Sequence, residues 1–107
     1  MSDSIRERAL AAEQAANVLI LRDRSQVERA FRMGLEVYSV AEPDAVPEVF
    51  LAARNECDAQ QGLRRIGGRV SRYNGVGYWA PVRLSADYHL VPDWEGGGLI
   101  AADLAGG

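Results

Sequence analysis

The segment from Arg64 to Leu84 concentrates the side chains best suited to binding a partner. It carries five arginines together with Tyr73, Tyr78 and Trp79, and it contains no acidic residue. Guanidinium groups form paired hydrogen bonds with phosphates and carboxylates, while aromatic rings stack on bases or anchor protein interfaces. The segment is therefore a candidate surface for nucleic acid or for a protein, and a purely structural use of the same side chains stays open.

Charge is unevenly distributed along the chain. Residues 59–86 carry +5, so the remaining residues must carry −8 to give the net charge of −3. All twelve basic residues are arginines, which excludes a Schiff-base lysine and the lysine of a P-loop. Broad nucleic-acid affinity usually depends on a basic domain. The acidic remainder therefore favours a protein partner, and it could itself mimic or repel nucleic acid.

The chain offers few residues for catalysis or metal binding. Cys57 and His89 are its only cysteine and histidine, and nothing in the sequence brings a base to the thiol. Asp87 and His89 share one side of an expected strand near Asp93 and Glu95, but zinc sites usually need several His or Cys ligands. We therefore predict a protein that is not an enzyme and that has no metal and no cofactor.

One short motif matches the glycine pattern of dinucleotide-binding turns. Gly75-Val76-Gly77-Tyr78-Trp79-Ala80 reads G-x-G-x-x-A, which binds a pyrophosphate only between a strand and a helix. The alternation of apolar and polar residues after Pro81 predicts a strand instead of a helix. The motif is therefore interpreted as a hairpin turn.

The Asn74-Gly75 pair predicts a β-hairpin within the basic segment. Pairing Val70 with Ala80 through a three-residue loop, Asn74–Val76, places the apolar side chains on one face. The other face, with its arginines and two aromatic rings, then points outward into solvent. The predicted partner-binding set is this outward face and two residues of the next loop: Arg65, Arg69, Tyr73, Trp79, Arg83, Asp93 and Trp94.

The N-terminal residues must supply helices that support this hairpin. Ser4 followed by Glu7 predicts a helix N-terminus, and apolar residues continue at helical spacing to Phe31. We favour a helical reading from Ser4 to Met33, with a break near Asp23, over the alternative of helix–strand–helix. Residues 17–23 are helix in the first case and strand in the second.

The rest of the chain predicts a mixed fold. Leu35–Val40 alternates as a strand does, and Asp44 and Pro47 predict a helix that ends near Gln60–Gly62. After the hairpin come a strand at Tyr88–Val91 and, at residues 99–102, a short strand or nothing regular. The order α-β-α-β-β-β predicts an α+β fold, with two or three helices of the N-terminal half packed on a small antiparallel sheet built largely from the C-terminal half.

Length and composition fit one small domain, residues 1–107, with a frayed tail at residues 103–107. A single cysteine excludes an internal disulfide and favours a cytoplasmic location. No signal peptide and no membrane-spanning segment are predicted, because the N-terminal apolar run, Val18–Leu21, is only four residues long and far too short to span a bilayer.

Size and mixed surface charge are similar, at the level of a class, to those of small accessory proteins of phages and mobile elements. Such proteins commonly act by occluding a host complex. We therefore expect a non-enzymatic inhibitor of a host nucleic-acid-handling or defence complex, which binds a protein or ribonucleoprotein partner as a monomer or a homodimer. The alternative is a small nucleic-acid-binding regulator that uses the same basic hairpin.

Overall fold

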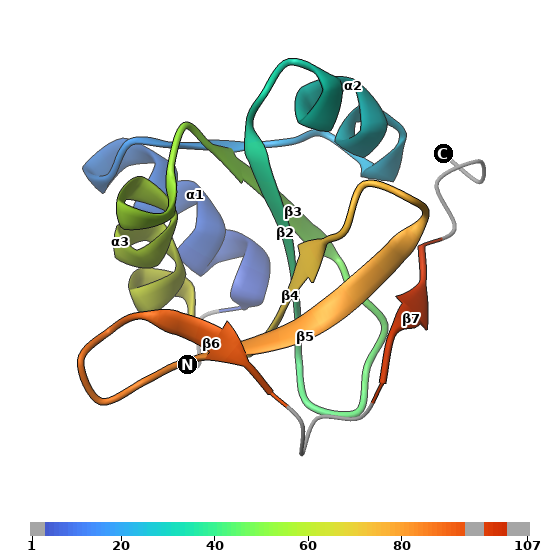
Figure 1. Ribbon diagram of the computed structural model, residues 1–107. Coiled ribbons are helices and arrows are strands. Elements are labelled where there is room, and N and C mark those ends of the chain that lie inside the picture. The colour runs from blue at the N-terminus through green and yellow to red at the C-terminus, as the bar shows by residue number, and fades with distance from the viewer. Residues whose placement is uncertain (1–3, 94–97, 103–107) are drawn as a thin grey trace.

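The computed structural model describes residues 4–93 and 98–102 as a twisted antiparallel sheet with helices on both faces (Figure 1). The helices are α1 (Ile5–Ala15), α2 (Val27–Arg32) and α3 (Glu56–Ile66), and a 3-10 turn, η1 (Arg24–Gln26), leads into α2. The strands are β1 (Val18–Ile20), β2 (Glu36–Ala41), β3 (Val49–Ala53), β4 (Arg69–Tyr73), β5 (Tyr78–Leu84), β6 (Leu90–Pro92) and β7 (Ile100–Ala101). The order across the sheet is β1-β3-β2-β4-β5-β6, with β7 beside β5. The predicted α+β class is confirmed.

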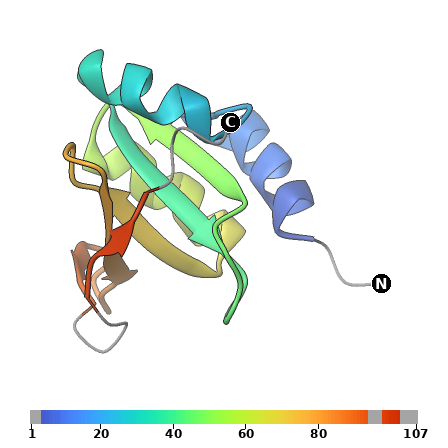
Figure 2. The same cartoon turned by 90° about the vertical axis from the view of Figure 1, so that its right-hand side faces the viewer.

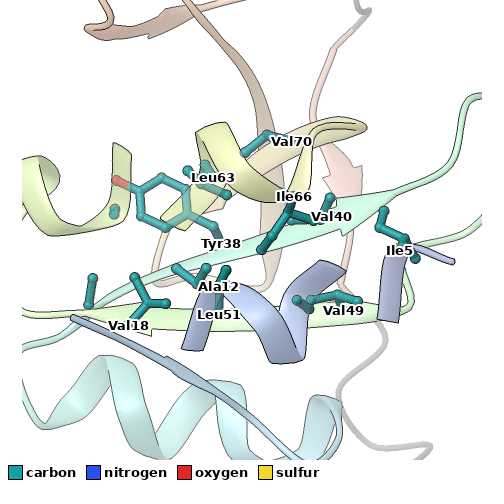
Figure 3. Close-up of a cluster of buried hydrophobic side chains, with 13 residues drawn as sticks. Ile5, Ala12, Val18, Tyr38, Val40, Val49, Leu51, Leu63, Ile66 and Val70 are labelled. Atoms are coloured by element: carbon teal, nitrogen blue, oxygen red, sulfur yellow. The ribbon is translucent and has the colours of Figure 1, made fainter. Parts of the chain in front are cut away.

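Two helices, α1 and α3, cover one face of the sheet and enclose the first core (Figures 1 and 3). Alternate side chains of the central strands point into it, among them Tyr38 and Val40 of β2 and Leu51 of β3. Helix α3 approaches β1 closely because residue 62 is glycine: a Cβ there would lie 2.7 Å from a methyl carbon of Val18. The first core therefore lies between these two helices and the sheet.

Side-chain caps begin both of the long helices. The Ser4 hydroxyl accepts the amide of Glu7 at 3.1 Å, which confirms the predicted start of α1. The Asn55 side chain accepts the amide of Asp58 at 2.8 Å and begins α3. None of the helices in residues 4–93 and 98–102 is long and apolar enough to cross a membrane.

Helix α2 covers only one end of the opposite face, where it encloses a second core (Figure 2). The rings of Tyr73 and Trp79 lie in this core with centroids 5.4 Å apart, and the Trp79 indole stacks on Phe50 at 6.0 Å. Tyr73 and Trp79 are each only 3% exposed. The prediction that Tyr73 and Trp79 point outward is therefore wrong, because α2 and its neighbours cover that half of the hairpin face.

Three rows of side chains cross this second face from strand to strand. The row under α2 is apolar and aromatic: Val37, Tyr73, Trp79 and Ile100. The next row contains small or polar residues: Ser39, Ser71, Pro81 and Asp93. The row farthest from α2 holds Ala41, Arg69, Arg83 and Val91. The polar and charged side chains of this face thus lie beyond the row under α2, with both arginines in the row farthest from it.

Two segments that the sequence predicted to be helical are strands. Residues 18–20 form β1, so the helix–strand–helix alternative is correct for the N-terminal region. Residues 49–53 form β3, a central strand whose five residues are all buried, and α3 begins only at Glu56. A strand buried on both faces is continuously apolar and shows no alternation, so its pattern cannot be distinguished from that of a helix.

The β4–β5 hairpin has a three-residue loop, as predicted, but the loop lies one residue later, at Gly75–Gly77. The Asn74 amide donates to the Tyr78 carbonyl at 3.0 Å, and the Asn74 side chain accepts the amides of Val76 and Tyr78. Val70 consequently pairs with Val82 and not with Ala80. The register differs by two residues, so every side chain keeps its predicted face.

Candidate interaction surface

The predicted partner-binding residues divide between two layers of the molecule. Arg69, Tyr73, Trp79 and Arg83 share the second face of the sheet, as predicted, although only the two arginines are exposed. Arg65 lies elsewhere, in the last turn of α3, where it lines a different cavity with residues of α1. The predicted hairpin surface is thus reduced to its arginine end.

Asp93 joins this arginine end, because its amide donates to the Pro81 carbonyl at 3.0 Å and continues the pairing of β6 with β5. Trp94 and Glu95 lie outside the described residues. Two members of the predicted set, Arg69 and Arg83, therefore meet a third, Asp93, at one place on the surface.

These three residues line a cavity of about 560 Å³, here called the arginine cleft. Its remaining lining is largely apolar and comes from α3, both hairpin strands and the β2–β3 loop: Pro43, Leu63, Gly67, Gly68, Val70, Val82 and Leu84. A volume of this size is typical of binding pockets. A ligand in the cleft would contact both the apolar wall and the guanidinium groups of Arg69 and Arg83.

Two glycines shape the back of the arginine cleft. Gly67 and Gly68 join α3 to β4 with φ angles of +73° and +81°, which only glycine adopts readily. A Cβ at Gly68 would lie 2.8 Å from the Ala41 carbonyl oxygen, whereas one at Gly67 would meet nothing within 4 Å. The turn therefore presses β4 against β2 while leaving the side toward Gly67 open.

The two arginines of the cleft lie opposite each other, one step beyond the Val70–Val82 pair. Arg69 donates to the carbonyl of Ala45 at 3.3 Å, and neither Arg69 nor Arg83 forms an ion pair with another described residue. Like charges directly across a strand pair repel each other. An anionic group placed between the two guanidinium groups would relieve that repulsion.

Arg72, a fifth arginine of the basic segment, is used structurally. It donates to the carboxylates of Glu36 at 2.6 Å and Glu56 at 3.2 Å, and to the hydroxyl of Tyr38 at 2.6 Å. The Tyr38 hydroxyl in turn donates to Glu36 at 2.7 Å. Burial and this hydrogen bond raise the pKa of Tyr38. The network ties β2 and β4 to the start of α3.

A second cavity, here called the aromatic cleft, lies over the Phe50–Trp79 stack and has a volume of about 340 Å³. It is bounded by the 3-10 turn, the β2–β3 loop and β7 through Arg24, Val46, Pro47, Ile100 and Ala101. The sequence identified Trp79 as a binding residue but missed Phe50 and Ile100. No local pattern signals that β7 returns to the edge of β5, because that pairing joins residues distant in sequence.

The residues considered for catalysis are held on different elements. Cys57 lies exposed in the first turn of α3, and His89 lies in the turn between β5 and β6. Within the described ranges, no cluster of three or more His, Cys, Asp or Glu side chains is placed to hold a metal ion. The arginine cleft offers apolar surface and two guanidinium groups, and the aromatic cleft offers mainly apolar and aromatic surface.

No protein-family model matches the chain, and neither the curated proteins nor the solved structures contain a significant match. Function must therefore be inferred from the two clefts themselves.

Proposed function

We propose that the protein is a non-enzymatic interaction protein whose arginine cleft binds an acidic segment of a protein partner. The observation that carries the proposal is the adjacency of Arg69 and Arg83 beside a cavity with apolar walls. A carboxylate between the guanidinium groups would form charge-assisted hydrogen bonds with both. An aliphatic side chain next to that carboxylate would fill the cavity and bury apolar surface.

A protein partner is favoured over nucleic acid for two reasons. The chain has a net charge of −3, so its overall field repels a polyanion. The rings of Tyr73 and Trp79 are buried, so they offer no face on which bases could stack. A nucleic-acid-binding regulator is therefore the second candidate, supported only by the exposed arginines.

The biological role that fits such a surface is inhibition by occlusion. A chain of 107 residues that holds one acidic segment of its partner would cover a patch needed by another molecule. Size and charge pattern favour a host nucleic-acid-handling complex as the target, as for small accessory proteins of phages and mobile elements. Within that role, the arginine cleft supplies the contact and the acidic remainder discourages nucleic acid from binding nearby.

Fluorescence anisotropy with labelled peptides and oligonucleotides tests this proposal. The peptide probes combine two or three Asp or Glu residues with one Leu, Ile or Val, and the oligonucleotides are short single- and double-stranded DNA and RNA. We expect selected peptides to bind and oligonucleotides not to bind at low or physiological salt. Arg69→Gln with Arg83→Gln should weaken peptide binding at least ten-fold, or about 1.4 kcal/mol.

The matched control is Arg29→Gln with Arg54→Gln, which removes the same charge from two exposed arginines far from the cleft along the chain. Equal losses in both double variants would show that general charge, not the cleft, holds the peptide. Oligonucleotide binding that weakens steeply with salt would favour the regulator instead. Absence of binding to every probe would reject the arginine cleft as the site.

A further inference from the structure

The C-terminal strand β7 lies along one end of the β5 edge (Figure 1). Only two residue pairs join the strands, Tyr78 with Ala101 and Trp79 with Ile100. The Ala102 amide donates to the Gly77 carbonyl at 2.8 Å and closes the ladder. Residues 98–101 are all exposed. Strands this short are marginal unless packing supports them, so β7 is a weakly held occupant of that edge.

The aromatic cleft lies beside the same edge and is filled in part by β7. Ile100 stands directly opposite Trp79, so the two side chains share a face, and Ile100 lines the cleft while remaining 38% exposed. A free strand edge supplies main-chain hydrogen bonds, and a pocket beside it selects alternate side chains. Together these are the two requirements for recognition of an extended peptide by strand addition.

The length of the available edge is limited by β6. That strand pairs with Val82–Leu84 of β5, and the Asp93 amide occupies the carbonyl of Pro81. An added strand can therefore pair with residues 77–80, which is enough for one side chain in the aromatic cleft and one on either side of it. The site would bind a short apolar segment and not a long strand.

We propose that this edge is a strand-docking site. An extended segment of a partner protein pairs antiparallel with residues 77–80, displaces β7 and inserts one β-branched or leucine side chain over Trp79. The chain's own β7 shows the chemistry that the site accepts: an uncharged segment with an aliphatic residue at its centre. This site is distinct from the arginine cleft. The strand-docking site would bind the partner through main-chain pairing and apolar contacts, whereas the arginine cleft would recognise its acidic groups.

Competition with β7 sets the expected affinities. A tethered segment acts at an effective concentration on the order of millimolar, so an external peptide must outcompete it. Weakening β7 should therefore strengthen binding of the peptide in trans. Removing the side chain of Ile100 from the cleft is the smallest change that does this, because Ile100 lines the cleft and lies directly opposite Trp79.

The experiment uses the full chain with Trp94→Phe, so that Trp79 is the only indole and reports on the cleft. The probe is a synthetic peptide with the sequence of residues 98–103, GLIAAD, and its control is the rearranged peptide GLDAAI. We expect Ile100→Asp to increase acrylamide quenching of Trp79 several-fold, and GLIAAD alone to reverse the change. The parent chain should bind GLIAAD at least ten-fold more weakly than the variant does.

Leu99→Asp is the matched control, because Leu99 is exposed, does not line the cleft and lies next to Ile100. It should behave as the parent does. Ile100→Ala is measured in parallel, since it empties the cleft without adding a charge. A GLIAAD peptide that is N-methylated at the amide equivalent to Ala102 should bind more weakly, because it loses the hydrogen bond to Gly77.

Several outcomes would overturn the proposal. Unchanged acrylamide quenching of Trp79 in Ile100→Asp and Ile100→Ala would show that β7 does not shield Trp79 from solvent. Equal reversal by both peptides would show that pairing and position do not matter. Concentration-dependent dimers without peptide binding would assign the edge to a second copy of the chain. Gln substitutions at Arg69 and Arg83 leave this test intact, so failure here is separable from failure of the arginine cleft.

Discussion

At the scale of single residues, two buried tyrosines act as ties between elements. The Tyr38 hydroxyl lies between Arg72 and Glu36, and the Tyr73 hydroxyl donates to Glu28 of α2 while it accepts the Gly77 amide. Burial, followed by the hydrogen bond to a carboxylate, raises the pKa of each tyrosine. In both cases the neutral hydroxyl is the form that fits, because a phenolate would face a carboxylate.

A pH dependence of stability follows from these raised pKa values. Tyrosines of the unfolded chain ionise near pH 10, at about their reference pKa, while the folded chain holds Tyr38 and Tyr73 protonated to higher pH. Above that pH the unfolded state therefore binds fewer protons than the folded state, and the free energy of unfolding falls as pH rises. Below it the contribution is fully present. The contribution of Tyr38 to the slope should approach about 1.4 kcal/mol per pH unit, and Tyr73 should add a contribution of the same sign.

Urea denaturation between about pH 8 and pH 11 measures this slope. Tyr73→Phe should make this slope smaller than that of the parent chain. The same slope in the variant and in the parent chain would mean that Tyr73 titrates alike in the folded and unfolded chain, which would contradict its burial against Glu28.

At the scale of elements, the contact between α2 and the tip of the β4–β5 hairpin depends on a missing side chain. A Cβ at Gly75 would lie 2.6 Å from the Phe31 ring, while one at Gly77 would meet nothing within 4 Å. Both glycines have similar positive φ angles, +88° and +90°. The pair therefore separates the cost of backbone conformation from the cost of a clash.

We predict that Gly75→Ala lowers the free energy of unfolding more than Gly77→Ala does. The backbone cost is common to both and amounts to about 1 kcal/mol, whereas the clash with Phe31 adds about 1–3 kcal/mol of overpacking. Urea titrations of both variants, and of Gly75→Ala combined with Phe31→Ala, measure the difference. Equal losses in the two single variants would show that α2 moves away from the hairpin without cost.

The elements that the sequence identified correctly carry a signal in their own residues. Strand β2 is buried on both faces, but Glu36 and Ser39 interrupt its apolar residues and mark it as a strand, and the Ser4 cap is a local signal that needs no tertiary context. Strand β3 is also buried on both faces, but it was missed because all five of its residues are apolar, and β1 was missed because its three residues continue an apolar stripe begun by α1. Both errors reflect burial that only the assembled sheet creates.

The binding set was only partly predictable for a similar reason. Side-chain alternation placed Arg69, Tyr73, Trp79 and Arg83 on one face, and this is what the structure contains. Alternation does not say what covers a face, and α2 covers the half with Tyr73 and Trp79. The cavity beside Arg83 and the return of β7 to β5 both depend on contacts between distant segments.

At the scale of the whole molecule, the two cores share the same sheet. Neighbouring residues of β2 enter opposite cores, Val37 beneath α2 and Tyr38 beneath α1 and α3. Strand β3 contributes to both cores in the same alternating way. Loss of packing in either core must therefore loosen strands that the other core needs, and we expect the two cores to unfold together.

Truncations on opposite sides of the sheet test this coupling. Leu63→Ala empties part of the first core and should lower the free energy of unfolding by about 2–5 kcal/mol, and Val27→Ala in the second core should lower it by about 2 kcal/mol. Each variant is unfolded in urea in the Trp94→Phe background. Far-UV circular dichroism then follows the helices, while fluorescence follows Trp79 inside the second core.

The decisive comparison is the fluorescence midpoint of Leu63→Ala, because Trp79 lies on the far side of the sheet from the substitution. In one cooperative unit, that midpoint falls as far as the circular-dichroism midpoint does. Leu10→Ala, at an exposed position of α1, should change the free energy of unfolding measured by either probe by no more than about 0.5 kcal/mol. If Trp79 kept the parent midpoint while the helices unfolded early, the two cores would be separate units and the shared strands would not couple them.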